Sequence, residues 1–358
     1  MWEIEIMKQR DPNVPWITGE VAVSGFTFPQ VSTRLDLADT LGSFKARWSS
    51  ARMNYAVEPG LYAVGHPGAD SPVLVSANYK LSFDRLRENL SGLDLWILVI
   101  DTKGINVWCA AGKGTFGTEE LVGRIAQVGL GEVVTGRSLI LPQLSAPGVA
   151  AHEVLKRTGF SVIYGPVRAA DLPEFLRTGQ KATPSMKAVR FDLRDRLILT
   201  PIELAGALKP ALILLGVLFA LTLVRVGFAP FPILLMAAVG KLIPFLGAIL
   251  AGAFFTPLLL PLIPGRAFAW KGWLLGLAWT LLYLQLMHPL WPEGWKTALL
   301  YLLLLPPIAS FLAMNFTGAS TYTSLSGVVK EMRIALPLQI VSAGLGILVL
   351  ILTLGAAL

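Results

Sequence analysis

Cysteine and histidine are scarce in this sequence of 358 residues. Cys109 is the single cysteine, which excludes an intramolecular disulfide, a four-cysteine zinc site and a self-contained iron–sulfur cluster. The three histidines, His66, His152 and His288, stand far apart along the chain and give no local multi-histidine metal site. The scarcity of these two residue types therefore excludes metal sites built from several cysteines or from neighbouring histidines.

Charged residues become rare after residue 200. Residues 201–358 contain 8 Lys and Arg and 3 Asp and Glu, against 22 and 20 in residues 1–200. A segment this apolar predicts a membrane domain rather than a second soluble domain. We therefore expect a soluble domain at 1–180, a linker at 181–208 and a transmembrane domain at 209–358.

The formal net charge of +7 does not point to nucleic acid. Most of the excess lies in the apolar second half, where basic loops are expected on the cytoplasmic side of a membrane. The sequence has no basic stripe with interleaved aromatic residues. We therefore expect membrane lipid, and no nucleic acid, among the partners.

Five apolar stretches in the second half approach the length of about 20 residues that spans a bilayer. They are 209–228, 242–263, 270–288, 297–313 and 335–356. The intervening segment 229–241 contains two prolines and is expected to form a partly buried turn.

The basic residues that flank these stretches predict the orientation in the membrane. They precede the first and the fifth stretch and lie between the second and the third, so five spans with a cytoplasmic N-terminus place each cluster inside. The N-terminus shows no apolar signal sequence. We expect a multi-pass protein of the cell inner (cytoplasmic) membrane, with the soluble domain in the cytoplasm and the polar loop 315–333 facing the same compartment.

From residue 72 onward, strand and helix signals alternate. Apolar runs predict strands at 72–79, 94–101, 138–142 and 160–167. Helical spacing predicts helices at 83–90, 118–129 with Thr118 as N-cap, 148–159 and 171–179. This alternation predicts an α/β domain with a parallel, doubly wound sheet, to which residues 1–71 add edge strands and a lid.

Ligands of doubly wound sheets bind at the carboxyl ends of the strands. The loops 104–117, 142–147 and 164–170 are expected to converge there. Cys109 lies in the first of these loops, in the sequence NVWCAAGKG directly after a buried strand. The small residues that follow it would let a flat, bulky ligand approach the backbone closely.

Two interpretations of Cys109 are open. It is either a small buried apolar side chain or a thiolate that acts as a nucleophile or a soft metal ligand. A short helix beginning at Cys109, together with Lys113, would favour the thiolate. A phosphate-binding loop is excluded, because Val107 stands where that motif requires glycine and Gly114 follows Lys113.

The segment NVWCAAGKGTF resembles the cap-helix motif of the mercury-methylating corrinoid proteins, the membrane-bound member of the HgcA–HgcB pair. Segments 60–87, 138–176 and 315–333 also look like that family. The first two are similar to the corrinoid domain of the large subunit of the corrinoid iron–sulfur protein of the acetyl-CoA pathway. The Trp-Cys pair and the five predicted spans favour the mercury family over this soluble relative.

The resemblance implies a Rossmann-like corrinoid-binding domain whose cofactor is a cobalamin-type corrinoid. Cys109 would be the catalytic residue and, through its sulfur, the lower axial ligand of the cobalt. The residues implied in cofactor binding are Asn106, Val107, Trp108, Cys109, Ala110, Ala111, Gly112, Lys113, Thr115, Gln143, Gly165, Pro166 and Arg168.

The implied reaction is transfer of a methyl group from cobalt to Hg(II), which forms methylmercury. The implied partners are a small ferredoxin-like iron–sulfur protein of the HgcB type as electron donor and a methyl donor of the methyltetrahydrofolate type. One alternative is a membrane-tethered corrinoid methyl carrier for another acceptor, as in the acetyl-CoA pathway. Another is a transporter with a nucleotide-sensing domain, which the missing nucleotide motifs disfavour.

Overall fold

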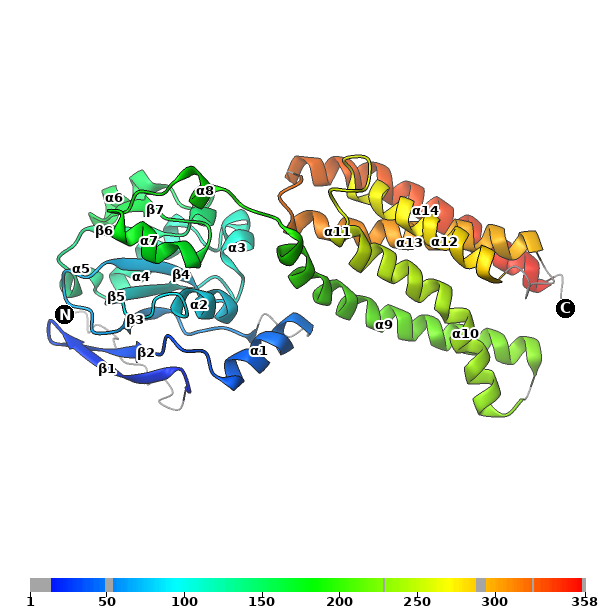
Figure 1. The fold of residues 1–358 in the computed structure, drawn as a ribbon, viewed down its shortest axis with the longest axis horizontal. Helices are drawn as coiled ribbons and strands as arrows, with labels where there is room; N and C mark the ends of the chain where they lie inside the picture. Colours follow the sequence, from blue (N-terminus) through cyan, green and yellow to red (C-terminus); the bar gives the residue numbers. More distant parts are fainter. Residues whose placement is uncertain (1–13, 49–53, 228, 288–293, 324, 356–358) are drawn as a thin grey trace. The chain divides into compact units, whose positions relative to one another are not determined.

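The computed structural model describes residues 14–48, 54–227, 229–287, 294–323 and 325–355. The chain divides into two compact units, Met1–Val189 and Arg190–Leu358 (Figure 1). The first unit is a mixed α/β domain and the second consists of helices. The predicted combination of an α/β domain with an apolar helical domain is confirmed.

The first unit is organised around a seven-stranded sheet. Its strands are β1 (Ile17–Val23), β2 (Phe26–Val31), β3 (Gly60–Val64), β4 (Val73–Ala77), β5 (Leu95–Ile100), β6 (Ser138–Leu141) and β7 (Ser161–Tyr164). The order across the sheet is β1-β2-β3-β5-β4-β6-β7. Strands β5, β4, β6 and β7 are parallel, as predicted. The N-terminal residues extend this sheet with β3, antiparallel to β5, and with the β1–β2 hairpin.

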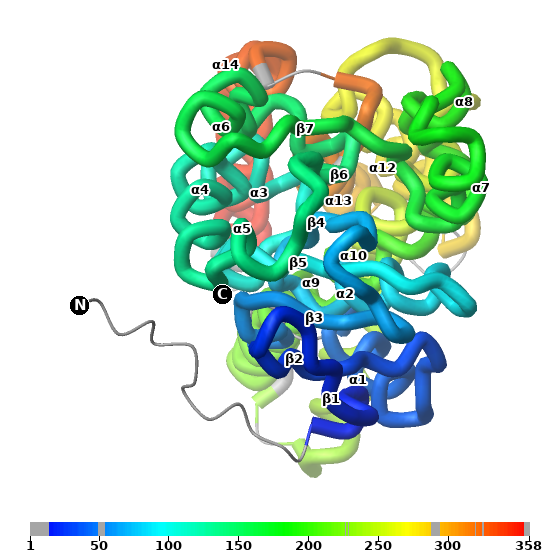
Figure 2. The backbone as a smooth tube through the Cα atoms, turned by 90° about the vertical axis from the view of Figure 1, so that its left-hand side faces the viewer, coloured from blue at the N-terminus to red at the C-terminus, as the bar shows by residue number. Residues whose placement is uncertain are grey.

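Helices cover both faces of the sheet. One face carries α2 (Lys80–Arg87) and α7 (Leu172–Arg177); the other carries α3 (Val107–Lys113), α4 (Thr118–Gln127), α5 (Leu130–Val133) and α6 (Ala151–Thr158). Figure 2 views the sheet edge-on, with α4, α5 and α6 to its left and α7 to its right. This unit also contains α1 (Leu37–Trp48), α8 (Pro184–Lys187) and short 3-10 helices.

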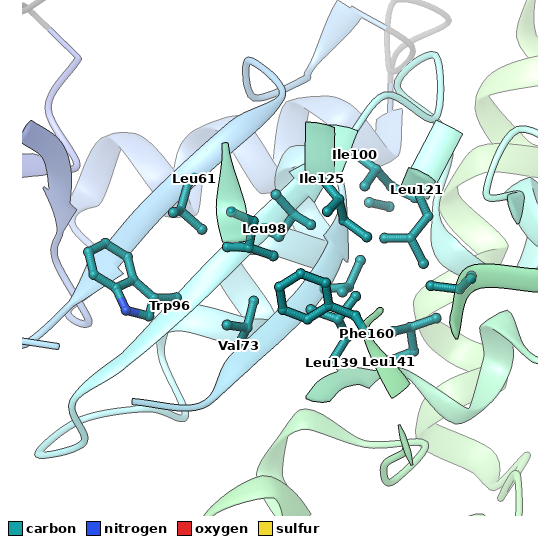
Figure 3. Close-up of a cluster of buried hydrophobic side chains, with 14 of the residues drawn as sticks. Leu61, Val73, Trp96, Leu98, Ile100, Leu121, Ile125, Leu139, Leu141 and Phe160 are labelled. Carbon is teal, nitrogen blue, oxygen red and sulfur yellow. The ribbon is translucent and has the colours of Figure 1, made fainter. Parts of the chain in front are cut away.

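Strand β5 shows why the sheet is buried on both sides. Its six residues are all buried, and they alternate between the two cores. Trp96, Leu98 and Ile100 lie in the core beneath α4 and α6 (Figure 3). A strand with two buried faces requires a continuous apolar run rather than an alternating one. The run at 94–101 therefore predicts this central strand correctly.

The start of α4 differs from the prediction. Gly117, not Thr118, is the N-cap residue, and it has extended backbone angles. Thr118 is the first helical residue, and its hydroxyl accepts a hydrogen bond from the Ala150 amide at 2.8 Å. The hydroxyl thus joins α4 to the start of α6, a tertiary contact that the local sequence pattern does not reveal.

The described residues of the second unit form five long helical segments. They are α9 (Leu193–Val226), α10 (Phe231–Leu250) continued by the π-helix η4 (Ala251–Phe255) and α11 (Thr256–Leu258), α12 (Phe268–Met287), α13 (Gly294–Asn315) and α14 (Leu325–Gly355). Among the described helices, four are long and apolar enough to cross a membrane by length and composition: Leu193–Arg225, Phe231–Leu258, Gly294–Gly318 and Ser326–Thr353. Helix α12 forms at the third predicted span but is not one of these four.

Three predicted boundaries in this unit differ from the structure. The expected turn at 229–241 is wrong, because α10 begins at Phe231 and tolerates a proline in its first turn, where the missing N–H bonds nothing. Helix α9 begins at Leu193, inside the expected linker, and the Asp192 side chain caps it. The expected loop 315–333 contains the short helix η6 (Phe316–Ala319) and the first turns of α14.

Helix α12 lies antiparallel to α13 in close contact. A Cβ on Gly272 would lie 2.6 Å from the Ala309 carbonyl oxygen, and one on Gly276 would lie 2.8 Å from the Pro306 Cα.

A small apolar cluster joins four helix ends: Leu199 near the start of α9, Leu260 after α11, Phe268 at the start of α12 and Phe316 after α13. Helix α12 therefore runs alongside the apolar helices along the same stretch of the bundle.

Candidate functional site

The connections between the parallel strands indicate where a ligand of this fold is expected. The chain leaves β4 for α2 on one face of the sheet, and it leaves β6 for α6 on the other face. The carboxyl ends of β4 and β6 therefore flank the point where the winding changes direction, which is the usual ligand crevice of a doubly wound sheet. The loop after β5 and the short helix η2 (Gln143–Ser145) after β6 both lie at this edge.

A buried asparagine organises the loop after β5. The Asn78 side-chain oxygen accepts hydrogen bonds from the Thr102 amide at 3.0 Å, the Thr102 hydroxyl at 2.8 Å and the Gly104 amide at 3.0 Å. The Asn78 amide donates to the Asp101 carboxylate at 3.2 Å. Asn78 directly follows β4, so it ties the ends of β4 and β5 together and fixes the loop that leads to α3. The sequence interpretation missed this role, although a polar residue at the carboxyl end of an apolar run signals it.

Asp101 is a second fixed point of this loop. Burial raises the pKa of its carboxyl, but hydrogen bonds from Lys103 outweigh that effect and hold the pKa below its ordinary value. The Lys103 amide and ammonium donate to the two oxygens of this carboxylate. The Asp101 amide in turn donates to Glu120 of α4 at 2.8 Å. The loop is therefore held from both sides before α3 begins.

Helix α3 carries Cys109 in its first turn. Asn106 is the N-cap, and its side-chain oxygen accepts a hydrogen bond from the Cys109 amide at 2.9 Å. The helix thus begins at Val107, two residues earlier than the expected start at Cys109. The amide of Cys109 is occupied by the cap rather than directed at its own sulfur. The helix ends at Gly114, which takes the left-handed conformation with φ of 82°.

The two faces of α3 differ sharply. Val107, Ala110 and Ala111 are buried in the core. Cys109 is half-buried, and Trp108 is 37% exposed, which is unusual for so large an apolar side chain. Gly112 is exposed, and a Cβ added to it would meet nothing within 4 Å. The outer face therefore offers a half-buried thiol, a partly exposed aromatic side chain and an open glycine, a set that suits a flat ring-shaped group.

The segment after β6 packs closely against the end of α3 at Gly148. A Cβ on Gly148 would overlap the Phe116 carbonyl oxygen and lie 3.1 Å from the Ala111 Cα. The Gly148 amide donates to the Ser145 carbonyl of η2 at 2.9 Å. The predicted convergence of loops 104–117 and 142–147 is therefore present in the structure. Half-buried Gln143 begins η2, and Thr115 lies where its hydroxyl donates to the Ala110 carbonyl at 3.5 Å.

The third predicted loop lies one strand farther along the sheet. Gly165 and Pro166 are buried after β7, and the Gly165 amide donates to the Leu141 carbonyl at 2.8 Å. Arg168 is half-buried and precedes α7. The Tyr164 hydroxyl donates to the Val149 carbonyl at 2.7 Å, which links the end of β7 to the segment that follows η2.

The α/β segment matches known proteins. Residues 43–176 match the family model described as the CO dehydrogenase/acetyl-CoA synthase delta subunit. The chain is 34% identical over 131 residues to the gamma subunit of the acetyl-CoA decarbonylase/synthase complex of Methanopyrus kandleri, covering 36% of this chain and 28% of that protein. It is 31% identical over 135 residues to the gamma subunit of Methanocaldococcus jannaschii, covering 36% and 27%. The chain thus spans less than a third of the length of these relatives.

These comparisons confirm the predicted relationship to proteins of the acetyl-CoA pathway for the segment that holds β3 to β7 and α3. The apolar helices lie outside the residues that the family model matches. The finer resemblance to the mercury-methylating proteins stays a prediction.

Proposed function

We propose that this chain is a membrane-anchored, corrinoid-dependent methyltransferase in which the Cys109 sulfur is the lower ligand of the cobalt. One observation carries the proposal. The half-buried thiol lies on the outer face of α3, at the ligand-binding edge of a doubly wound sheet, inside the segment similar to acetyl-CoA decarbonylase/synthase subunits. The apolar helices of the second unit support the membrane anchor.

The residues around Cys109 suit such a cofactor. When bound, a corrinoid supplies a methyl group carried on cobalt. The outer residues Trp108, Gly112 and Lys113 would border the ring. The inner residues Val107, Ala110 and Ala111 are buried and hold α3 on the core. Gln143, Gly165, Pro166 and Arg168 would contact the ring or its tail from the neighbouring loops. The Asn106 cap and Gly148 fix the position of the thiol.

Two acceptors for the methyl group fit this site. The comparisons support a methyl carrier like the proteins of the acetyl-CoA pathway more directly than they support mercury methylation. The motif NVWCAAGKGTF, which occurs in the same chain as the apolar helices, supports Hg(II) as the acceptor. A thiolate is a soft, electron-rich metal ligand, so a corrinoid held by the Cys109 sulfur would supply a methyl group suited to an electrophilic acceptor. We therefore infer Hg(II) as acceptor and methylmercury as product, with the methyl carrier as the second candidate.

The single cysteine also implies partners. One thiol cannot hold an iron–sulfur cluster, so the electrons that keep the cofactor active would come from a separate ferredoxin-like protein of the HgcB type. The methyl group would come from a donor of the methyltetrahydrofolate type. The relatives are named as subunits of a complex, which supports the existence of protein partners. The basic helix ends support a location in the inner (cytoplasmic) membrane with the first unit in the cytoplasm.

An anaerobic single-turnover experiment tests the function. The purified full chain is loaded with methylated corrinoid and mixed with stoichiometric Hg(II), beside free methylcorrinoid and the variants Cys109→Ala and Lys156→Ala. Lys156 is exposed on α6 and serves as a surface control. We expect transfer at least about tenfold faster than free methylcorrinoid, a barrier lowered by about 1.4 kcal/mol or more. Cys109→Ala loses this advantage and Lys156→Ala retains it.

The absorption spectrum of the bound corrinoid separates the alternatives. Loss of the sulfur ligand in Cys109→Ala shifts the spectrum even where no methyl group is transferred. A bound corrinoid with a rate no better than free methylcorrinoid toward Hg(II), but a faster rate toward a thiol nucleophile, would establish the methyl carrier. A chain that binds no corrinoid would contradict both candidates.

A further inference from the structure

Helix α1 exposes an apolar stripe. Leu37, Leu41, Phe44 and Trp48 follow one another at intervals of four and three residues, so they lie on a single face of the helix. Their exposed fractions range from 45% to 73%. The rings of Phe44 and Trp48 lie 6.0 Å apart along this face. A contiguous row of exposed apolar side chains usually marks a contact surface.

The opposite face of α1 is fixed to the domain. Buried Asp39 accepts a hydrogen bond from the Lys80 ammonium at 2.7 Å and pairs with the Arg87 guanidinium. A Cβ on Gly42 would overlap the Tyr55 ring, and Ala46 is buried. The helix cannot turn its stripe inward without exposing this ion cluster. The stripe is therefore a stable feature of the outer surface.

The charged residues next to the apolar stripe of α1 indicate which kind of surface it contacts. The acidic side chain within α1, Asp39, faces inward, whereas Lys45 is exposed in the last turn beside Phe44. Exposed Arg34 precedes the helix, and exposed Asp36, which accepts a hydrogen bond from the Asp39 amide at 2.7 Å, lies at the opposite end of α1 from Lys45. An apolar face bordered by cations is typical of helices that lie in the interface of a membrane with anionic lipids.

We propose that α1 lies on the membrane surface, with its apolar stripe at the boundary of headgroups and acyl chains and Lys45 among anionic phospholipid headgroups. This inference rests on the membrane anchor of the proposed function. Only residues 190–192 separate the first unit from α9. Three residues reach roughly 10 Å at most. Such a tether joins the first unit to a helix of the proposed membrane anchor, so contacts of α1 with the same bilayer gain from a high effective concentration.

Spin labels on single cysteines test this contact. The full chain carries Cys109→Ser, and a cysteine for labelling is introduced by Leu41→Cys or Phe44→Cys. Leu155→Cys is the matched control, because Leu155 is an apolar residue of α6 that is half exposed. Each protein is reconstituted in vesicles of phosphatidylcholine and phosphatidylglycerol in equal amounts, and in phosphatidylcholine alone. Collision rates with oxygen, which partitions into lipid, and with a water-soluble nickel chelate are then measured.

We expect the ratio of oxygen to nickel accessibility to be several-fold higher at the two α1 positions than at Leu155→Cys in the anionic vesicles, and lower in phosphatidylcholine alone. High nickel accessibility at α1 would overturn the proposal, because the stripe would then face water. Low accessibility to both reagents would also overturn it, because protein would then cover the stripe. Equal ratios in the two lipids would overturn the role of the anionic headgroups.

Corrinoid loading of the unsubstituted chain, measured in the same vesicles, separates this proposal from the function. Lipid contact without corrinoid binding would contradict the methyltransferase and leave the α1 contact standing. Failure of the chain to float with the vesicles would contradict the membrane anchor itself.

Discussion

Gly112 offers a direct test of whether a corrinoid lies on α3, because replacing it by alanine adds a single methyl group to that face. It is an exposed helical glycine on the outer face of α3, and an added Cβ would meet no protein atom within 4 Å. Gly123 in α4 has the same surroundings. Alanine is favoured over glycine in a helix by about 0.5–1 kcal/mol, so neither substitution should destabilise the chain.

We expect Gly112→Ala to weaken corrinoid binding at least severalfold, because a ring lying on α3 would meet the new methyl group. Gly123→Ala should bind like the unsubstituted chain. Absorbance titration measures both affinities, and thermal unfolding verifies that both variants are folded. Equal affinities for the two variants would place the corrinoid away from this face.

At the residue scale, the sequence predicts which side chains lie at the edge of the sheet better than it predicts their contacts. A thiol in the segment that follows a buried run is expected near the carboxyl end of that strand, and Cys109 lies in α3, which begins seven residues after β5. The cap at Asn106 and the bonds of Asn78 to Thr102 and Gly104 escaped prediction. The bonds of Asn78 depend on where the ends of β4 and β5 stop relative to each other, and neither segment alone determines this register. The Asn106 cap joins residues only three apart, so the preference of asparagine for N-cap positions is the signal that could have revealed it.

Elements are joined by two kinds of ion pair whose energies should differ. Arg87 is fully buried and bonds Asp84 at 2.8 Å together with Asp39, thus linking α2 to α1. Arg157 pairs with Glu119 at 2.5 Å on the exposed surface of α6 and α4. Removing one partner of a buried pair leaves an uncompensated charge, whereas an exposed pair is screened by water.

We expect Arg87→Met to lower the free energy of unfolding by about 3–5 kcal/mol, because Lys80 alone would face two buried carboxylates. Arg157→Met should change the stability far less. Chemical unfolding of the full chain in detergent, followed by a signal from the first unit, gives both values. Similar losses for the two variants would show that the buried cluster does not stabilise the attachment of α1.

The same cluster predicts a response to acid. Burial would raise the pKa of the Asp39 carboxyl, but hydrogen bonds from Lys80 and Arg87 hold it below the ordinary value of 3.8. A carboxyl whose pKa is lower in the folded state stabilises the fold above its unfolded pKa, and this contribution disappears as pH falls through the folded pKa. We expect the stability to fall as pH drops below about 4, and Asp39→Asn to flatten this dependence. Unfolding midpoints of both proteins, measured across the acid range, test the prediction. The same dependence of the midpoint on pH in Asp39→Asn and in the unsubstituted chain would refute it.

At the element scale, hydrophobic periodicity predicted the four strands of residues 72–179 and the helices α2, α4, α6 and α7, because each is an apolar run or stripe bounded by turn residues. It did not reveal the short helices α3 and α5. It failed at residues 229–241, where two prolines suggested a turn. Only the first-turn position of Pro232, which no periodicity reveals, makes a helix there possible. The strands of the first 71 residues were expected only in outline, because β3 pairs antiparallel with β5, more than thirty residues away.

For the whole molecule, the split between a charged half and an apolar half indicates two units, since few charges can be buried in lipid. Apolar length alone leaves the number of spans open, because α12 is outside the set of four apolar helices. The cluster of Leu260, Phe268 and Phe316 brings the end of α11, the start of α12 and the end of α13 together. Helix α12 would therefore cross the membrane wherever its neighbours cross it, which favours the prediction of five spans.

Five spans and four spans place the segment before α14 on opposite sides of the membrane. With five spans, Thr321 is expected on the same side of the membrane as the first unit. If α12 does not cross, Thr321 is expected on the opposite side. Thr321→Cys, Ala229→Cys and Lys156→Cys, each in a Cys109→Ala background, are exposed to an impermeant maleimide in intact cells. We expect labelling at Ala229→Cys alone, and at the other two only after permeabilisation. Labelling of Thr321→Cys in intact cells would establish four spans, and the segment before α14 would then be separated by the membrane from the α/β unit that carries Cys109.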